Sequence, residues 1–177
     1  MTIDTLAMLF PNVAVTRGIA VRVAVSFLSE QSDPTTNRWF WSYHVRIENG
    51  SEVAVQLLSR SWTIVDGRGT IHEVIGEGVV GEMPLIAPGA SFDYVSGCPL
   101  DTPSGAMSGT YRMVDEDGTA FDVDIPKFQP ANNAVLWPTS IVGNTIPSGY
   151  AGRVTVFVDS NNLPPLWLYW PILLLWD

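Results

Sequence analysis

Apolar and polar residues alternate along most of the first 128 residues of the chain. Between residues 19 and 27, for example, every second residue is Ile, Val or Phe, and Ala, Arg or Ser stand between them. A period of two is typical of a β-strand with one buried face. This pattern, together with short runs of strand-forming residues, predicts strands over 19–27, 39–48, 53–64, 71–75, 92–95, 109–114 and 119–125.

The predicted strands are short, and turn residues separate them at intervals of about 8 to 12 positions. No stretch of the sequence shows the 3.6-residue period of an amphipathic helix. The chain therefore has the pattern of an all-β protein. We expect an immunoglobulin- or fibronectin type III-like β-sandwich of about seven antiparallel strands.

Three local signals refine this topology. Asn49 and Gly50 stand between two alternating runs, and an Asn-Gly step there predicts a hairpin that makes the second and third strands antiparallel neighbours. The alternation slips by one residue between Leu57 and Leu58, which indicates a β-bulge or a crossing to the other sheet. The proline-containing stretch 97–105 is expected to be a loop.

The core of the sandwich is expected to be aromatic. Trp39, Trp41, Tyr43 and Trp62 fall at strand spacing, and burying each is worth on the order of 2–3 kcal/mol. Cys98 is the single cysteine, so no intramolecular disulfide can staple the sheets. We expect Cys98 to be a small loop residue.

Composition narrows the class of protein. Hydrophobic residues make up 46% and charged residues 15% of the 177 residues, a balance that excludes a disordered chain. The formal net charge of −9 repels nucleic acid and anionic lipid. A single cysteine and an N-terminus without a secretory signal favour a reducing, cytoplasmic location.

Four sequence pieces resemble the ApaG family: QLLSRSW at 56–62, GEGVVGEMPLIAPG at 76–89, SGCPLDTPSG at 96–105 and GTYRMVDEDG at 109–118. The resemblance covers about residues 14–128. It implies a fibronectin-like sandwich of two antiparallel sheets that mediates protein contacts, and some bacterial members are associated with cobalt and magnesium efflux. Residues 1–13 are then an N-terminal extension, and residues 129–177 are a C-terminal extension outside the family pattern.

The C-terminal extension ends in an almost continuous apolar run at 163–176. Because Pro164, Pro165 and Pro171 interrupt it, these residues are too short and too broken for a transmembrane helix. We expect an accessory tail, either poorly ordered or folded back over the sandwich. Two alternatives stay open: its tryptophans lie in a membrane interface, or the tail covers an apolar groove of a neighbouring subunit.

Gly76, Gly78 and Gly81 form a G-x-G-x-x-G pattern, which in a dinucleotide-binding fold places a pyrophosphate at a helix N-terminus. That context is absent, because Pro84 and Pro88 prevent the required helix. We therefore expect the glycines to permit a tight backbone turn. Binding of a phosphate group stays an alternative.

The hairpin around Asp115 and Asp117 resembles the start of a calcium loop, but Pro126 stands where the twelfth-position glutamate is needed. With Asp122 and Asp124 nearby, weak binding of Mg²⁺ or Co²⁺ is the alternative to a plain turn.

His44 and His72 are the only histidines of the chain, and their spacing matches neither a zinc site nor a catalytic triad. We expect no cofactor, no resident metal and no catalysis.

The best candidate contact surface combines Arg60 and Trp62, in one phase of a strand, with Met83 and Leu85 of an apolar loop and with the three glycines of the pattern above. Arg and Trp are enriched at the energetic centres of protein interfaces. The competing interpretation is that Trp62 belongs to the core and Arg60 pairs locally. We predict a non-enzymatic module that binds an unidentified protein through the sandwich surface and loop 76–89, and self-association stays open.

Overall fold

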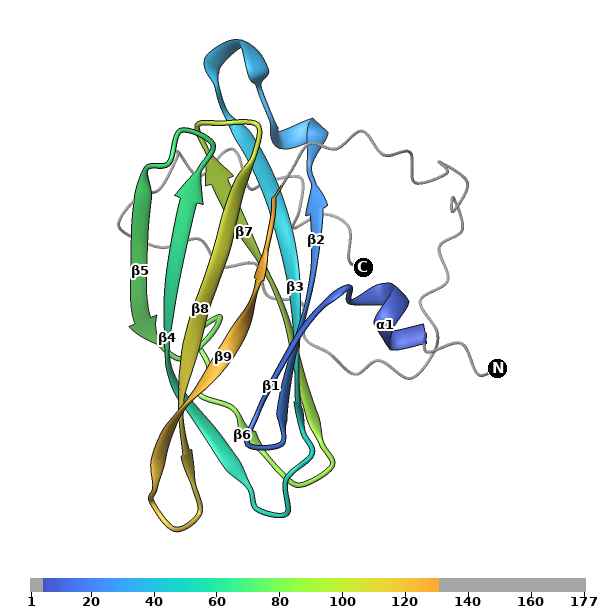
Figure 1. The fold of residues 1–177 in the computed structure, drawn as a ribbon, viewed down its shortest axis with the longest axis vertical. Helices are drawn as coiled ribbons and strands as arrows, with labels where there is room; N and C mark the ends of the chain where they lie inside the picture. The colour runs from blue at the N-terminus through green and yellow to red at the C-terminus, as the bar shows by residue number, and fades with distance from the viewer. Residues whose placement is uncertain (1–4, 131–177) are drawn as a thin grey trace.

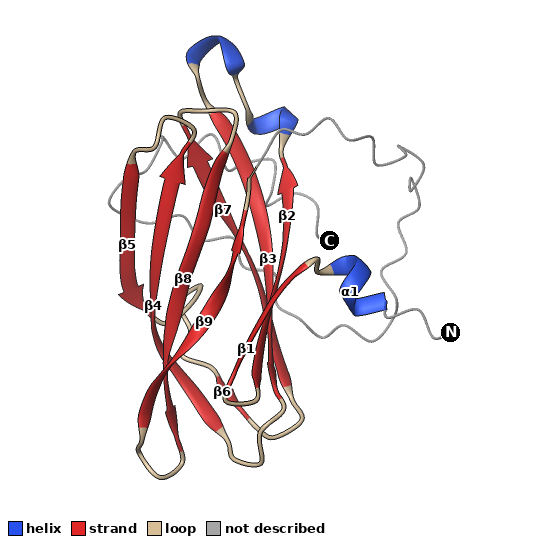
Figure 2. Ribbon diagram, in the orientation of Figure 1, coloured by secondary structure: helices blue, strands red, loops and turns tan. Residues whose placement is uncertain are grey.

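The computed structural model describes residues 5–130, which form two antiparallel β-sheets packed face to face (Figure 1). Within those residues, helical structure is confined to α1 (Thr5–Leu9) and two 3-10 turns, η1 (Ser29–Gln31) and η2 (Pro34–Thr36) (Figure 2). The predicted all-β sandwich is confirmed.

Residues 5–130 contain nine strands, two more than predicted; the additional strands, β1 and β6, are short. The nine are β1 (Asn12–Thr16), β2 (Ile19–Phe27), β3 (Trp39–Asn49), β4 (Val55–Asp66), β5 (Ile71–Glu77), β6 (Leu85–Ile86), β7 (Ser91–Leu100), β8 (Gly105–Asp115) and β9 (Ala120–Phe128). The first sheet has the order β1-β2-β3-β7. The second has the order β5-β4-β8-β9, and β6 pairs with β4 beyond the end of β5.

The core lies between the inner faces of the two sheets and is rich in aromatic rings, as expected. Trp41, Tyr43 and Trp62 are buried, whereas Trp39 is partly buried and stacks on Trp41. Trp62 lies at the centre, with ring centroids 5.4 Å from Tyr43 and 6.0 Å from Phe128. These contacts hold the sheets together without a disulfide.

The hairpin predicted at Asn49 and Gly50 is wrong, because β3 and β4 lie in different sheets. The Asn49 side chain is 1% exposed, and its amide donates to the carbonyl oxygens of Val53 (2.8 Å) and Ile86 (2.9 Å). These bonds fix a crossover between the sheets. Asn49 therefore serves as a buried hydrogen-bonding residue, and Gly50 has no positive φ.

The slip in alternation along the third predicted strand is a β-bulge. In the pairing of β4 with β8, Leu57 lies opposite Met113 and Ser59 lies opposite Arg112, so Leu58 is the extra residue. An extra residue reverses the side to which later side chains point. The bulge thus turns residues 60, 62 and 64 toward the inter-sheet space.

The loop expected at 97–105 begins later than predicted, because β7 continues to Leu100 opposite β3. Pro99 lies opposite Phe40, whose carbonyl oxygen accepts from Leu28 and therefore faces β2. The nitrogen of Pro99 then points to the free side of an edge strand, where a missing N–H costs no ladder bond. Gly97 leaves room for the Phe40 ring, which a Cβ there would approach to 2.7 Å.

The two flanks of the sandwich differ. On one flank β1 and β9 are in contact, and the Asp124 amide donates to the Thr16 hydroxyl at 3.1 Å. On the other flank lie β5 and β7, the last strands of their sheets, and β5 is bonded to β4 alone among the described strands (Figure 1). Within the described part of the chain, β5 therefore has a free edge.

Residues 5–13, in the predicted N-terminal extension, pack onto the first sheet. After α1 the Phe10 side chain is buried, and its ring lies 4.8 Å from the His44 ring on the outer face of β3. Asn12 then begins β1. Almost all of the predicted C-terminal extension lies outside the described residues, and so do all the predictions about its apolar run.

Candidate functional site

Large apolar side chains are exposed along one edge of the second sheet. Ile71 and Ile75 on β5 are 64% and 76% exposed, Leu85 on β6 is 71% exposed, and Met83 between the two strands is 43% exposed. β5 and β6 pair with successive parts of the same side of β4. We call Ile71, Glu73, Ile75 and Glu77, together with Met83 and Leu85, the β5–β6 edge.

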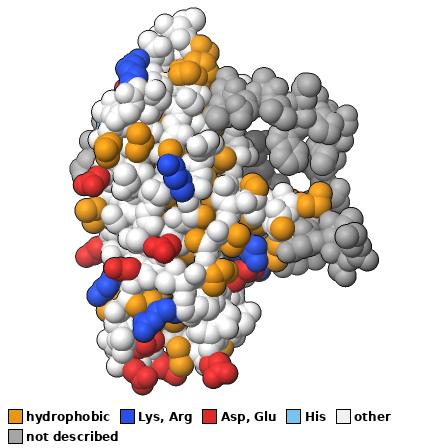
Figure 3. Space-filling view, viewed as in Figure 1, with side chains coloured by type: hydrophobic (Ala, Val, Ile, Leu, Met, Phe, Trp, Pro, Cys, Tyr) orange, Lys and Arg blue, Asp and Glu red, His pale blue; other side chains and the backbone are white. Residues whose placement is uncertain are grey.

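Acidic side chains alternate with the apolar ones on this edge. Glu73 and Glu77 share the phase of Ile71 and Ile75, and all four are exposed. Figure 3 shows hydrophobic and acidic side chains following one another down the left margin of the molecule, where β5 runs. The outer side of β5 is therefore a row of apolar and negatively charged groups.

Backbone groups of β5 also face away from the sheet. The Asp66 amide donates to the carbonyl of Thr70, and the Gly78 amide donates to the carbonyl of Leu58. Antiparallel strands alternate bonded and non-bonded pairs, so these two bonds assign residues 72, 74 and 76 to the bonded pairs with β4. The N–H and C=O groups of Ile71, Glu73 and Ile75 consequently point outward.

Arg60 holds the end of β5 in place. Its Nη1 atom donates to the carbonyl oxygens of Glu77 and Gly78, both at 2.9 Å. The guanidinium reaches them by crossing Gly76, where a Cβ would lie 2.9 Å from Nη1. Arg60 thus pairs locally, and Gly76 is required for its passage.

The other two glycines of the G-x-G-x-x-G pattern shape a tight turn. Gly78 has φ +56°, and a Cβ there would lie 2.2 Å from the carbonyl oxygen of Glu82. Val80 and Gly81 both have positive φ, while Val79 and Glu82 exchange backbone hydrogen bonds of 2.8 and 2.9 Å. This is the geometry of a type I′ turn. Because the amides of Gly78, Val79 and Glu82 bond within the protein, none of the three is available to a phosphate.

Trp62 does not contribute to a surface. Only 2% of it is exposed, and its ring packs on Tyr43, Tyr111 and Phe128. The bulge turns it inward together with Arg60, so its predicted binding role is corrected to a core role. Of the other candidate residues, Met83 and Leu85 are exposed, whereas Arg60 and the glycines support the backbone.

Three tyrosines meet inside the sandwich near Arg60. Tyr94 and Tyr111 share a hydrogen bond between their hydroxyl groups, and Tyr43 bonds to Ser96. Burial raises the pKa of all three hydroxyls, that of Tyr43 to about 12. We call Tyr43, Tyr94 and Tyr111 the buried tyrosine group. Its hydroxyls stay protonated at neutral pH and act as hydrogen-bonding groups between the sheets.

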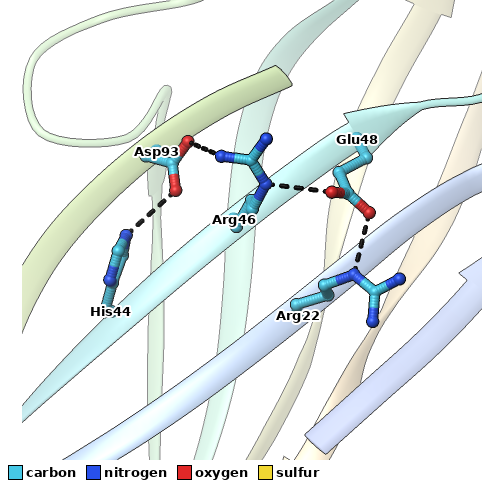
Figure 4. Close-up of polar contacts among 5 residues, drawn as sticks. All are labelled: Arg22, His44, Arg46, Glu48 and Asp93. Atoms are coloured by element: carbon cyan, nitrogen blue, oxygen red, sulfur yellow. Dashed lines mark hydrogen bonds and ion pairs between the residues drawn. The ribbon is translucent and has the colours of Figure 1, made fainter. Parts of the chain in front are cut away.

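A ladder of charged side chains crosses the outer face of the first sheet (Figure 4). Asp93 accepts from His44 (3.0 Å) and Arg46 (2.7 Å), and Glu48 accepts from Arg46 (2.9 Å) and Arg22 (2.8 Å). Burial alone would raise the pKa of Glu48, but the two arginines outweigh it and hold that pKa below its usual value. Each of the two carboxylates forms an ion pair with at least one arginine, and such cross-strand pairs stabilise the pairing of neighbouring strands.

Two carboxylates of the predicted cation-binding alternative, those of Asp115 and Asp122, have partners within the protein. The Asp115 carboxylate accepts from the amides of Asp117 and Thr119 and so closes the β8–β9 turn, while Asp122 pairs with Arg112. Within residues 5–130, no three His, Cys, Asp or Glu side chains gather at a metal-binding distance.

Cys98 lies on β7, not in the expected loop, and burial raises the pKa of its thiol to about 12. It is therefore unsuited to act as a nucleophile.

Sequence reasoning missed Ile71 and Ile75. Their strand was predicted, and the alternation of Ile with Glu in one phase was visible in IHEVIGE. An apolar phase that also contains glutamates signals an exposed face, since a buried face would exclude the charges.

Comparison with known proteins agrees with this architecture. The family model of the ApaG domain matches residues 29–115. Over 115 residues the chain is 55% identical to protein ApaG of Allorhizobium ampelinum, an alignment that covers 65% of this chain and 88% of that relative. The chain belongs to the ApaG family. Protein ApaG of Brucella suis is 54% identical over the same length and with the same coverage.

Solved structures of the family share the fold. The crystal structure of an ApaA protein from Bordetella pertussis matches with a TM-score of 0.63 and 47% identity, covering 64% of this chain and 92% of that one. A second X-ray structure matches with a TM-score of 0.64 and 41% identity, covering 70% and 94%. No helix among the described residues of the present chain has the length and apolar character to span a bilayer.

Proposed function

We propose that this ApaG family member is a non-enzymatic module that binds a protein partner through the β5–β6 edge. The observation that supports the proposal is the coincidence of exposed apolar side chains with outward-facing backbone groups on one strand. An exposed, unpaired strand edge is a liability unless something pairs with it or covers it. Strand edges of this kind are a recurrent mode of peptide recognition.

The described residues give no support to catalysis. A nucleophilic centre needs an activated nucleophile, a base and a group that orients the base. His44 faces Asp93 and the Phe10 ring, and Cys98 is buried with a raised pKa. The charged side chains of the ladder neutralise one another, as expected for a structural role.

The small-ligand and cation alternatives gain no favourable observation. The turn at Gly78 bonds its amides internally, and Asp115 and Asp122 have partners within their own hairpin. The efflux association and the cytoplasmic location stay predictions from the sequence. Titrating the amide spectrum with ATP, Mg²⁺ and Co²⁺ tests this class, and saturable shifts confined to 76–81 or 115–124 would favour it.

The proposal is tested by a pair of lysine substitutions. Ile75→Lys places a charge on the β5–β6 edge, whereas Val15→Lys places one at an equally apolar site on β1 that is 67% exposed. We expect saturable capture of a defined partner by the wild type and by Val15→Lys, and at least about tenfold weaker capture by Ile75→Lys, since burying an isoleucine is worth about 1.5–3 kcal/mol. Equal capture by both variants contradicts the proposal. Thermal unfolding of each variant checks that the fold is intact.

A further inference from the structure

The backbone of β5 is prepared for one more strand. The outward N–H and C=O groups of Ile71, Glu73 and Ile75 repeat at the spacing of an antiparallel ladder. No proline interrupts residues 71–77. At Glu77 the carbonyl oxygen is already bound by Arg60, so a paired segment ends there. The length available corresponds to a short extended peptide.

The side chains of β5 specify what such a segment carries. On the outer face of the sheet, the order along β5 is Ile71, Glu73, Ile75 and Glu77. Residues directly opposite one another in a ladder lie with their Cβ atoms about 5 Å apart, so they select one another by size and charge. An apolar residue fits opposite each isoleucine, and Lys or Arg fits opposite each glutamate. Met83 and Leu85 extend the apolar surface beyond Glu77.

A second copy of this chain fits poorly at the same edge. The antiparallel register that places Ile71 opposite Ile75 of the second copy also places Glu73 opposite its own counterpart. In this first register, the two Glu73 carboxylates repel each other, because like charges directly opposite in a ladder are destabilising. Shifting the register by two residues removes that charge repulsion, but it places each isoleucine opposite a glutamate and so leaves the isoleucines without an apolar partner. The net charge of −9 adds a long-range preference for a basic partner over a second acidic chain.

We propose that the β5–β6 edge binds an extended segment of another protein in which apolar and basic side chains alternate on one face, added as a strand beside β5. This inference rests on the proposed function and specifies its partner class. The chemistry requires Lys or Arg at every fourth residue, with Val, Ile or Leu midway between them. The intervening residues face the inter-sheet side of the edge, beside Val74, and are small or apolar.

Three synthetic peptides test the inference. The matching peptide is Lys-Thr-Val-Thr-Lys-Thr-Val, the acidic control replaces both lysines with glutamate, and the scrambled control is Lys-Lys-Thr-Thr-Thr-Val-Val. Each is titrated into the ¹⁵N-labelled full chain at low salt, where surface charge is least screened. We expect saturable shifts of the Ile71, Glu73 and Ile75 amides with the matching peptide. Its Kd is expected to be about tenfold or more below those of both controls.

Charge reversal on the protein provides the matched variants. Glu73→Lys with Glu77→Lys inverts the edge and should transfer the preference to the acidic peptide. Glu116→Lys with Asp117→Lys changes the net charge equally, but on the exposed β8–β9 turn, and should leave the preference unchanged. Transfer of the preference by both double variants would show a response to net charge alone and overturn the inference.

Comparing Ile75→Pro with Ile75→Ala separates the backbone contribution from that of the isoleucine side chain. The Ile75 nitrogen faces outward, so Ile75→Pro removes a donor for the added strand while keeping every bond between β4 and β5. Relative to Ile75→Ala, we expect about fivefold weaker binding of the matching peptide by Ile75→Pro, with unchanged thermal stability. Val74→Pro removes a ladder bond to β4 and should lower stability instead. Equal peptide affinity of folded Ile75→Pro and Ile75→Ala contradicts strand addition.

Three further outcomes distinguish failure of this inference from failure of the proposed function. If the wild type dimerises in sedimentation experiments and Ile75→Pro abolishes the dimer, the occupant of the edge is a second copy and the inference is wrong. If no peptide binds but partner capture still depends on Ile75, the inference fails while the proposed function stands. If the peptide binds and capture does not depend on Ile75, the proposed function fails by itself.

Discussion

Replacing Gly78 by alanine should destabilise the protein more than replacing Gly118. Both glycines have left-handed backbones, with φ of +56° and +80°. At Gly118 an added Cβ meets nothing within 4 Å, whereas at Gly78 it lies 2.2 Å from the carbonyl oxygen of Glu82. The pair therefore separates the cost of the backbone conformation from the cost of the close approach.

The expected losses of unfolding free energy follow from these two costs, the left-handed backbone and the close contact. A left-handed backbone costs an alanine about 1–2 kcal/mol, which is the whole expected loss of unfolding free energy for Gly118→Ala. At Gly78 the Glu82 carbonyl must move by about 0.8 Å to restore a 3.0 Å contact. Forced displacement of this kind adds about 1–3 kcal/mol, so the total loss for Gly78→Ala is about 2–5 kcal/mol.

Urea denaturation of both variants, followed by tryptophan fluorescence, measures the difference. An intact m-value with a lower midpoint indicates a change in stability alone. Equal losses for the two variants would refute the argument that Gly78 is required by the approach of Glu82. In that case the glycine pattern would need another explanation, and the phosphate alternative would regain weight.

Three further predictions concern the interior. Arg60→Met should lower the unfolding free energy by about 1.5–3 kcal/mol in urea denaturation, because it removes charge-assisted bonds to the carbonyls of Glu77 and Gly78; an unchanged midpoint contradicts this. The buried tyrosine group has pKa values raised above the unfolded value of 10, so its stabilisation is complete below pH 10 and is lost as the pH rises toward 12. Tyr43→Phe should weaken that alkaline loss in denaturation at pH 9 to 11, and an identical pH profile refutes the assignment. The Cys98 thiol should react with a thiol reagent only on unfolding, and a fast reaction in native buffer argues against its burial.

The strand order depended on contacts that periodicity does not encode. Seven strands were evident from alternation, and the bulge at Leu58 appeared as a change of phase. The Asn49 turn was misassigned because two long-range acceptors, the carbonyls of Val53 and Ile86, use the side chain that a hairpin would leave in solvent. A local turn signal cannot contain that information, since Ile86 lies 37 residues away in sequence.

The candidate site was predictable only in part. Met83 and Leu85 were candidates for the contact surface and are exposed. The local pairing of Arg60 was the competing interpretation at that position. The side of the sheet to which Trp62 points depends on the bulge at Leu58, and the sequence alone left open whether the slip there was a bulge or a crossing to the other sheet. Ile71 and Ile75 needed one further fact, that β5 ends its sheet, because the same alternation in a central strand would leave no backbone groups free.

Pro99 weakens one route to polymerisation of this protein. Among the described strands, β7 is the other unpaired edge on the flank of β5, and at Pro99 it presents no donor to an incoming strand. Open-ended growth by edge-to-edge stacking needs two competent edges on every molecule. Because Pro99 leaves the β7 edge short of one ladder bond, every contact through that edge is weakened, and fibre growth by edge-to-edge stacking is disfavoured.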